Sequence, residues 1–286
     1  MKPIIKYRGG KSKEIKNFLQ FVPRDYNKYV EPFAGGAALF FYLEPQCALI
    51  NDINSKLIDF YRAVQNNYKA LKRELVELED IYRSNQEEFE VQKKLGLQDF
   101  VDNKNEDLYY LIRDMYNGKI DKKYLDATLY YFFINKTSYS GMLRFNAKGE
   151  FNVPFGRYKN FNAEIVSEEH HALLKRTEIT KGDYSDIFDR CSTTDFVFLD
   201  PPYDCVFTDY GNIDEFDFLE DSQVKLAQDF RNLPAKSLMI IGKTKLTEHL
   251  YKPYIKGEYS KKYAVNIRNR FKAESTHLII TNYNLK

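Results

Sequence analysis

The amino-acid sequence predicts an α/β fold with a helical insert, on three observations. Short apolar runs bounded by turn residues alternate with helical patterns near the start of the chain, and this pattern resumes after residue 160. Between these parts, from residue 56 to 82, large apolar residues recur at steps of three and four, the spacing of an amphipathic helix. A chain of 286 residues can hold one substantial α/β domain with such an insert, or two modest domains.

The first elements are predicted from the run KYVEPFAGGAALFFYL. It indicates a short strand that ends at Phe33, a glycine turn at Gly35 and Gly36, and a helix from about Ala37, which is the first half of a βαβ unit. The run CALINDIN then indicates a second buried strand, and this strand ends in Asp52.

The insert is predicted to continue with two more helices, over residues 107–117 and 123–135. The segment MLRFNAKGEFNV alternates about Ala147, Lys148 and Gly149, which predicts a β-hairpin. We therefore expect an inserted domain at residues 56–160, with residues 1–55 and 161–286 forming the sheet domain.

The α/β pattern resumes with three predicted strands, in the runs TEITKGDY, DFVFLD and SLMIIG. A helix is expected over residues 222–233, between the second and third of these strands. Two late strands are expected near residues 263–267 and 276–283.

Composition excludes several classes of protein. No apolar run approaches the roughly 18 residues that a membrane span needs, and the first residues do not resemble an export signal. The three cysteines are far apart and have no CxxC spacing, so neither a disulfide framework nor a metal site is predicted, and we expect a reducing, cytoplasmic location. The net charge of +2 is too small to indicate a polyanionic partner by itself, but Lys and Arg gather at residues 136–159 and 252–272.

Candidate ligand-binding residues stand where the predicted strands end. In open α/β sheets, ligands bind outside the carboxyl ends of the strands. Residues 33–36, Asp52, residues 182–183 and residues 200–203 all fall at such ends. Each has an ordinary structural explanation, since the glycines could form only a tight turn and Asp52 and Asp183 could cap helices. Four such groups together predict a binding site.

The first two groups favour an adenosine-containing cofactor. A glycine pair between strand and helix lets a ligand approach the backbone, and an acid at the end of the next strand suits a ribose hydroxyl pair. The dinucleotide fingerprint GxGxxG is absent, because the run is FAGGA, so a nicotinamide dinucleotide is disfavoured. The run RGGKSK lacks the first glycine of a Walker A loop, since Ile5 stands at that position, and we reject a phosphate-binding loop there.

The run DPPY, residues 200–203, favours a nucleobase as the substrate. It offers the Asp200 carboxylate, backbone carbonyls that the prolines keep out of a strand ladder, and the aromatic ring of Tyr203. Such groups can accept hydrogen bonds from an amino group and stack on the flat ring that carries it. The structural alternative is that the prolines merely end the strand and Tyr203 is a core residue.

Taken together, the motifs DPPY, EPFAGGAAL, KYRGGK and RFNAKGEFNVPFGRY, with an acid at Asp52, resemble the Dam-type (D12 class) adenine-N6 DNA methyltransferases over essentially the whole chain. The resemblance implies a doubly wound, mostly parallel seven-stranded methyltransferase sheet that binds S-adenosyl-L-methionine, with an inserted helical and hairpin domain at residues 56–160 for recognition of double-stranded DNA. It implies methyl transfer to N6 of a flipped adenine in a short palindromic site, for which GATC is the leading prediction.

The resemblance also assigns site residues. The catalytic residues are Asp200, Pro201, Pro202 and Tyr203. The cofactor-binding residues are Tyr7, Lys11, Phe33, Ala34, Gly35, Gly36, Asp52, Asp183 and Asp200. The DNA-binding residues are Tyr139, Ser140, Met142, Arg144, Asn146, Pro154 and Arg157. Three positions depart from the family pattern: Ala37 replaces a glycine of many relatives, Tyr7 stands where some members have tryptophan, and Ser140 replaces an asparagine common in GATC readers.

The same motifs also fit alternative functions. Related N4-cytosine and RNA-base methyltransferases use a similar polar residue followed by Pro-Pro and an aromatic. A non-catalytic DNA-binding module with a degenerate cofactor site is an alternative of another class. A cognate restriction endonuclease acting on the same site is a further candidate partner.

Overall fold

The computed structural model describes residues 1–7, 9–96, 102–124, 127–202, 220–262 and 274–284. They form two compact units. The first unit comprises Met1–Gly10 and Asn54–Arg176, and the second comprises Lys11–Ile53 and the described residues from Thr177 onward. The first unit therefore contains the whole of the predicted insert, and its role in DNA recognition stays a prediction.

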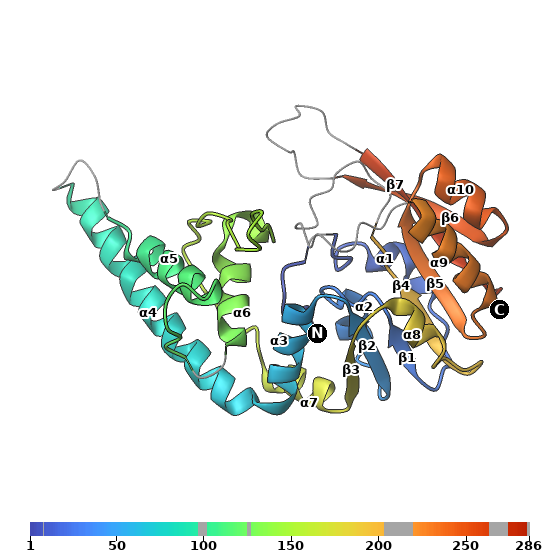
Figure 1. Ribbon diagram of the computed structural model, residues 1–286, viewed down its shortest axis with the longest axis horizontal. Helices are drawn as coiled ribbons and strands as arrows, with labels where there is room; N and C mark the ends of the chain where they lie inside the picture. The colour runs from blue at the N-terminus through green and yellow to red at the C-terminus, as the bar shows by residue number, and fades with distance from the viewer. Residues whose placement is uncertain (8, 97–101, 125–126, 203–219, 263–273, 285–286) are drawn as a thin grey trace. The chain divides into compact units, whose positions relative to one another are not determined.

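The second unit is built on a seven-stranded sheet with the strand order β3-β2-β1-β4-β5-β7-β6 (Figure 1). Strands β1 to β5 run parallel to one another, and β7 is antiparallel to both β5 and β6. The predicted α/β class with a mostly parallel seven-stranded sheet is confirmed. The strand bounds are β1 Tyr29–Glu31, β2 Ala48–Asp52, β3 Thr177–Lys181, β4 Phe196–Leu199, β5 Lys236–Gly242, β6 Ile255–Lys262 and β7 Glu274–Thr281.

Helices cover both faces of this sheet, as in doubly wound folds. Helices α8 (Tyr184–Phe188), α9 (Glu220–Asn232) and α10 (Lys245–Tyr251) pack on one face, in a buried cluster with the side chains of Val30, Leu49, Val197, Leu199, Met239 and Ile241. Neighbouring strand residues point to the opposite face. There, α1 (Ile15–Phe18) stacks Phe18 on Phe198, and α2 (Ala38–Leu43) places Phe40 beside Tyr29. Short 3₁₀ turns lie at Leu19–Phe21 and Lys252–Tyr254.

The first unit is mainly helical, with α3 (Ser55–Asn66), α4 (Tyr68–Leu95), α5 (Lys104–Tyr116), α6 (Thr128–Thr137) and α7 (Glu168–Lys175). Its apolar pattern from residue 56 to 82 continues through both α3 and α4. The chain nevertheless leaves helical geometry at Asn67, with φ −122° and ψ 24°, and this residue separates the two helices. The two other predicted helices are present as α5 and α6.

The predicted hairpin forms next to α5. Phe145 pairs with Phe151 across an antiparallel bridge, and the turn between them has Gly149 at φ 73°, where glycine is favoured. Asn117, at the end of α5, donates to the Phe151 carbonyl at 3.0 Å and accepts from the Phe151 N–H at 2.9 Å. The Tyr109 hydroxyl donates to the Val153 carbonyl at 2.7 Å. Helix α5 therefore fixes the second arm of the hairpin.

The late strands differ from the prediction in part. The strand expected near residues 276–283 is β7, whereas the one expected near residues 263–267 lies outside the described residues. Strand β6 was not predicted, because its sequence IKGEYSKK is polar and carries a glycine, as edge strands often do. Within the described part of the chain, no helix is both long and apolar enough to cross a membrane.

Candidate functional site

Most of the residues predicted at strand ends meet at one edge of the sheet. Strands β3, β2, β1 and β4 are neighbours and run parallel, so their carboxyl ends lie side by side. Asp183 follows β3, Asp52 ends β2, residues 33–36 follow β1, and Asp200 follows β4. Residues that are far apart in the sequence are therefore gathered in the second unit at the edge where ligands bind in such folds.

Asp200 is held by a buried lysine at this edge. The Lys11 ammonium donates to both carboxylate oxygens of Asp200, with Nζ–Oδ1 and Nζ–Oδ2 distances of 2.7 and 2.8 Å. The Lys11 side chain is 2% exposed and that of Asp200 is 21% exposed. A carboxylate has about four lone-pair sites. Lys11 contacts two of these sites and therefore orients the Asp200 carboxylate and balances its charge.

The two prolines after Asp200 are anchored by α9. Pro201 is buried and Pro202 is half-buried. The Pro202 carbonyl accepts a hydrogen bond of 3.0 Å from the side-chain amide of Gln223, whose side chain is 0% exposed. Sequence analysis did not single out Gln223, because one glutamine in an amphipathic helix carries no signal. Tyr203, the last residue of the motif, lies outside the described residues.

Asp52 is connected to the glycine turn after β1. Its Oδ2 accepts from the Gly35 N–H at 2.8 Å, and its side chain is only 7% exposed. The helix-cap explanation for Asp52 does not hold, since Asn54 is the residue whose side chain caps α3, by accepting from the Leu57 N–H at 3.2 Å. The turn itself has left-handed geometry at Gly35 (φ 46°) and at Ala37 (φ 50°).

Phe33 lies two residues after the end of β1, and Asp183 lies two residues after the end of β3. The Phe33 ring centroid is 5.1 Å from that of Tyr184, the first residue of α8. Asp183 is exposed and caps α8, because its Oδ1 accepts from the Ser185 N–H at 2.9 Å. The structural explanation of Asp183 as a helix cap therefore holds, and its contact with a cofactor stays a prediction.

Glu31 is a second acid near Asp200 that sequence analysis did not assign. It ends β1, is 2% exposed, and accepts a hydrogen bond of 2.8 Å from the Tyr29 hydroxyl. Burial raises the pKa of Glu31 well above its usual range; the Tyr29 hydrogen bond opposes this, and the negative charge of Asp200 raises the pKa further. The only available signal in the sequence was an acid inside an otherwise apolar strand.

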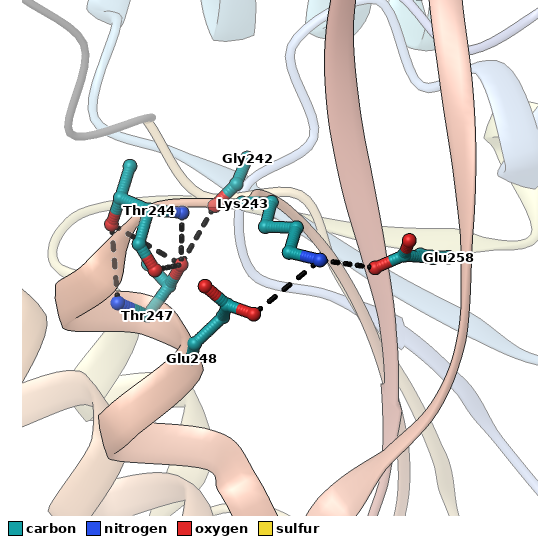
Figure 2. Close-up of polar contacts among 6 residues, drawn as sticks. All are labelled: Gly242, Lys243, Thr244, Thr247, Glu248 and Glu258. Carbon is teal, nitrogen blue, oxygen red and sulfur yellow. Dashed lines mark hydrogen bonds and ion pairs between the residues drawn. The ribbon is translucent and has the colours of Figure 1, made fainter.

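The next strand along this edge, β5, ends in a turn with many internal contacts (Figure 2). Thr247 donates to the Gly242 carbonyl at 2.8 Å, and Thr244 accepts from the Thr247 N–H at 3.1 Å to cap α10. The Lys243 ammonium lies 2.7 Å from Glu258 and 3.4 Å from Glu248 (Figure 2). These contacts fix the start of α10 and join it to β6.

The predicted DNA-contacting side chains belong to the first unit, on a short 3₁₀ turn (Tyr139–Gly141), on the hairpin and on the segment that follows the hairpin. Tyr139, Ser140, Arg144, Pro154 and Arg157 are exposed, whereas Met142 and Asn146 are half-buried. The Arg144 Nε donates to Asn152 Oδ1 at 2.8 Å, which restrains the guanidinium group. Asn146 has a role within the hairpin turn, since its Oδ1 accepts from the backbone N–H groups of Lys148 and Glu150, both at 3.0 Å.

Lys136, from the basic stretch of residues 136–159, lies close to Lys6 in the same unit. The Lys6 ammonium donates to the Lys136 carbonyl at 2.8 Å and lies 4.0 Å from the centroid of the Tyr158 ring. Burial, and then the positive charge of Lys6, lower the pKa of Lys136 to about 7. Tyr7, predicted to line the cofactor pocket, also belongs to this unit, and its carbonyl accepts from the Gly10 N–H at 3.1 Å.

Comparison with known proteins gives a consistent result. The family model described as D12 class N6 adenine-specific DNA methyltransferase matches residues 7–267. The type II methyltransferase M.CviBI of Paramecium bursaria Chlorella virus NC1A is 37% identical over 292 residues, covering 99% of this chain and 100% of the relative. The type II methyltransferase M.MjaIII of Methanocaldococcus jannaschii is 34% identical over 260 residues, or 84% and 83% of the two chains. A DNA adenine methylase of Vibrio cholerae is 27% identical over 201 residues, or 70% and 64%.

Proposed function

Because the chain belongs to the D12 class of N6 adenine-specific DNA methyltransferases, we propose that it uses S-adenosyl-L-methionine to methylate N6 of an adenine flipped out of a short palindromic duplex site. Adenine-specific methylation of DNA follows from the family. The methyl donor, the site residues and the target sequence are the proposal. The observation that carries it is the Asp200 carboxylate at the carboxyl end of β4, held by Lys11 and followed directly by Pro201.

The residues after β1 and β2 fit an adenosine-containing methyl donor. Asp52 offers a buried carboxylate for a pair of ribose hydroxyls, and the Gly35 N–H keeps that carboxylate in place. Gly35 has no side chain to block the approach of a ligand to the backbone. When bound, S-adenosyl-L-methionine supplies an electrophilic methyl group on a sulfonium. Phe33, Ala34 and Gly36 complete the proposed binding loop, and Asp183, Tyr7 and Lys11 are its further proposed contacts.

The chain's own task is to prepare the adenine amine. The lone pair of this amine is delocalised into the ring, so the nitrogen is a poor nucleophile. In our proposal the Asp200 carboxylate and the Pro201 carbonyl accept its two N–H bonds, which favours a pyramidal nitrogen with its lone pair directed at the methyl group. Lys11 keeps the Asp200 carboxylate oriented for this contact. Direct displacement needs no covalent intermediate with the enzyme.

The adenine must leave the duplex before it can reach Asp200. Flipping costs a few kcal/mol of stacking and pairing, so contacts to the rest of the duplex must offset it. We propose that Tyr203 stacks on the flipped base and that the hairpin of the first unit contacts the duplex. Arg144 is exposed and restrained by Asn152, and arginine is the commonest reader of guanine. GATC is therefore the leading target, and another short palindrome with adenine and guanine is the alternative.

Product analysis separates this proposal from its rivals. The purified protein is incubated with labelled S-adenosyl-L-methionine and either duplex DNA or RNA, and the digested nucleosides are identified by mass spectrometry. We expect N6-methyladenine from the duplex alone. N4-methylcytosine or methylated RNA would support the rival activities. Binding of the methyl donor without transfer to any substrate would support a non-catalytic module. A cognate restriction endonuclease and a cytoplasmic location stay predictions.

A further inference from the structure

We propose that Gln223 is a positioning residue for methyl transfer: its side-chain amide holds the Pro202 carbonyl and so orients the Pro201 carbonyl and the Asp200 carboxylate toward the adenine amine. This inference rests on the proposed function of the same site. It concerns a residue from α9, some twenty positions after the catalytic motif, with no sequence motif of its own.

The contact comes from a well-fixed helix. Gln223 Nε2 donates to the Pro202 carbonyl at 3.0 Å. Three side chains further along α9, those of Leu226, Ala227 and Phe230, are 0% exposed and belong to the cluster that packs on the sheet. Because the helix is anchored by this core, the amide reaches Pro202 from a position that cannot easily shift.

The chemistry of Gln223 indicates a use for its amide. Its side chain is 0% exposed, and among the described residues its Oε1 is buried without a hydrogen-bond partner. A buried polar atom without a partner lowers stability, and an apolar side chain of similar size would avoid that loss. The Nε2–H group of the amide is the part that makes a hydrogen bond, and its partner is Pro202 of the proposed catalytic motif.

The segment from Asp200 to Pro202 is therefore held at both ends. Lys11 holds the Asp200 carboxylate, and Gln223 holds the Pro202 carbonyl. Between these points the proline rings fix two of the backbone φ angles. The Pro201 carbonyl, which is proposed to accept one N–H of adenine, lies between the two anchors. Loss of the Gln223 contact releases one end and leaves the Lys11–Asp200 pair intact.

The test compares Gln223→Met, Gln223→Glu and the parent by single-turnover methyl transfer at saturating DNA and S-adenosyl-L-methionine. A misplacement of about 1 Å can cost on the order of 100-fold in rate, so we expect a fall of about 10-fold to 100-fold for Gln223→Met. Dissociation constants for DNA and for the methyl donor should stay close to those of the parent. The Tm of Gln223→Met should stay close to that of the parent, because removal of the unpartnered Oε1 offsets the loss of the hydrogen bond to Pro202.

Two further measurements exclude a merely structural role. Leu226→Met changes an equally buried residue of the same helix and should leave the rate unchanged. Gln223→Glu cannot donate while its carboxylate is ionised, but once protonated its hydroxyl can donate to Pro202. The ratio of its rate to that of the parent should therefore rise as the pH falls, and this comparison remains decisive if Gln223→Met does not fold.

A single-turnover rate of Gln223→Met equal to that of the parent would overturn the inference. So would a loss that follows only the folded fraction, or a Gln223→Glu to parent ratio that does not change with pH. If the parent itself transfers no methyl group to adenine, the proposed function fails, and this outcome is distinct from an active parent with an equally active Gln223→Met.

Discussion

Lys11 is a buried cation whose ammonium contacts both carboxylate oxygens of Asp200. This pair affects how the catalytic role of Asp200 should be tested. Removing one partner of a buried ion pair leaves the other charge uncompensated, at a cost of up to about 3–5 kcal/mol. Asp200→Ala alone therefore removes the proposed acceptor of the amine and also disturbs the fold around Lys11.

We predict that Asp200→Ala abolishes methyl transfer, and that the double variant Lys11→Met/Asp200→Ala recovers stability but not activity. The carboxylate acts on the amine at the chemical step, so binding of DNA by Asp200→Ala should change little. Thermal unfolding measures the stability of the two variants, and single-turnover kinetics measure their rate of methyl transfer. Turnover of Asp200→Ala within about tenfold of the parent, or about 1.4 kcal/mol in the barrier, would remove Asp200 from the mechanism.

Substitutions of Asp52 and Asn54 provide a test of the proposed cofactor site and its matched control. Both follow or end β2, but Asp52 contacts the glycine turn whereas Asn54 caps α3. We predict that Asp52→Ala weakens binding of S-adenosyl-L-methionine, because buried ribose hydroxyls lose their acceptor. Asn54→Ala should instead lower the free energy of unfolding by about 0.5–2 kcal/mol and leave the dissociation constant unchanged. Calorimetric titration with equal constants for Asp52→Ala and the parent would refute this role.

At the scale of elements, a buried polar cluster joins the start of α1 to the hairpin of β6 and β7. Glu14 lies 2.5 Å from the Lys261 ammonium and 2.9 Å from His277 Nδ1, and it accepts from the Tyr259 hydroxyl at 2.8 Å. Burial alone would raise the pKa of Glu14. The contacts with His277 and Lys261, the charge of Lys11 and the Tyr259 hydrogen bond outweigh burial and hold this pKa at about 2. The cluster therefore connects the loop that carries Lys11 to strands β6 and β7 at one edge of the sheet.

The depressed pKa of Glu14 predicts a pH-dependent contribution to stability. The ordinary value is 4.5 and the folded value is about 2, so the contribution is complete above pH 4.5 and is lost as the pH falls toward 2. We predict that Glu14→Gln is less stable than the parent at pH 7, and that the difference narrows below pH 4.5. Urea unfolding at a series of pH values measures this difference. A difference that stays constant down to pH 3 would contradict the assignment.

Elements with buried, apolar sequences were predictable, and those defined by long-range contacts were not. The runs that became β2, β4 and β5 are almost wholly buried, and their apolar composition marks them. Strand β6 is polar and lies at the edge of the sheet, where it is held by antiparallel pairing with β7. The break between α3 and α4 depends on one residue, Asn67, in a pattern that otherwise continues.

At the scale of the whole molecule, some features of the site could be predicted from the sequence, whereas others depend on long-range contacts. The carboxyl ends of parallel strands meet at one edge in any such sheet, so the placement of Asp52 and Asp200 at the same edge could be predicted from their positions at strand ends. The pairing of Lys11 with Asp200, the support of Pro202 by Gln223 and the burial of Glu31 depend on where loops and helices cross that edge. The sequence near each of these residues does not reveal such long-range contacts.

Target recognition is predicted to reside in the first unit, on a hairpin held by α5. We predict that Arg144→Ala loses about 1–3 kcal/mol of discrimination at the guanine of the site. Lys148→Ala, an exposed change at the tip of the same hairpin, should leave discrimination unaltered. Methylation rates on matched duplexes with and without the guanine measure both. An equal loss for Arg144→Ala on every duplex would identify Arg144 as a phosphate contact.

The central claim is that this chain methylates adenine N6 at one short palindrome, with GATC as the leading target. Its most direct test is to express the parent and Asp200→Ala in a host without DNA methylation and to map modified bases across the genome by direct sequencing. We expect N6-methyladenine confined to GATC with the parent and none with Asp200→Ala. A different single adenine motif would contradict the GATC assignment alone, whereas a genome without N6-methyladenine, while folded parent protein is present, would contradict the central claim.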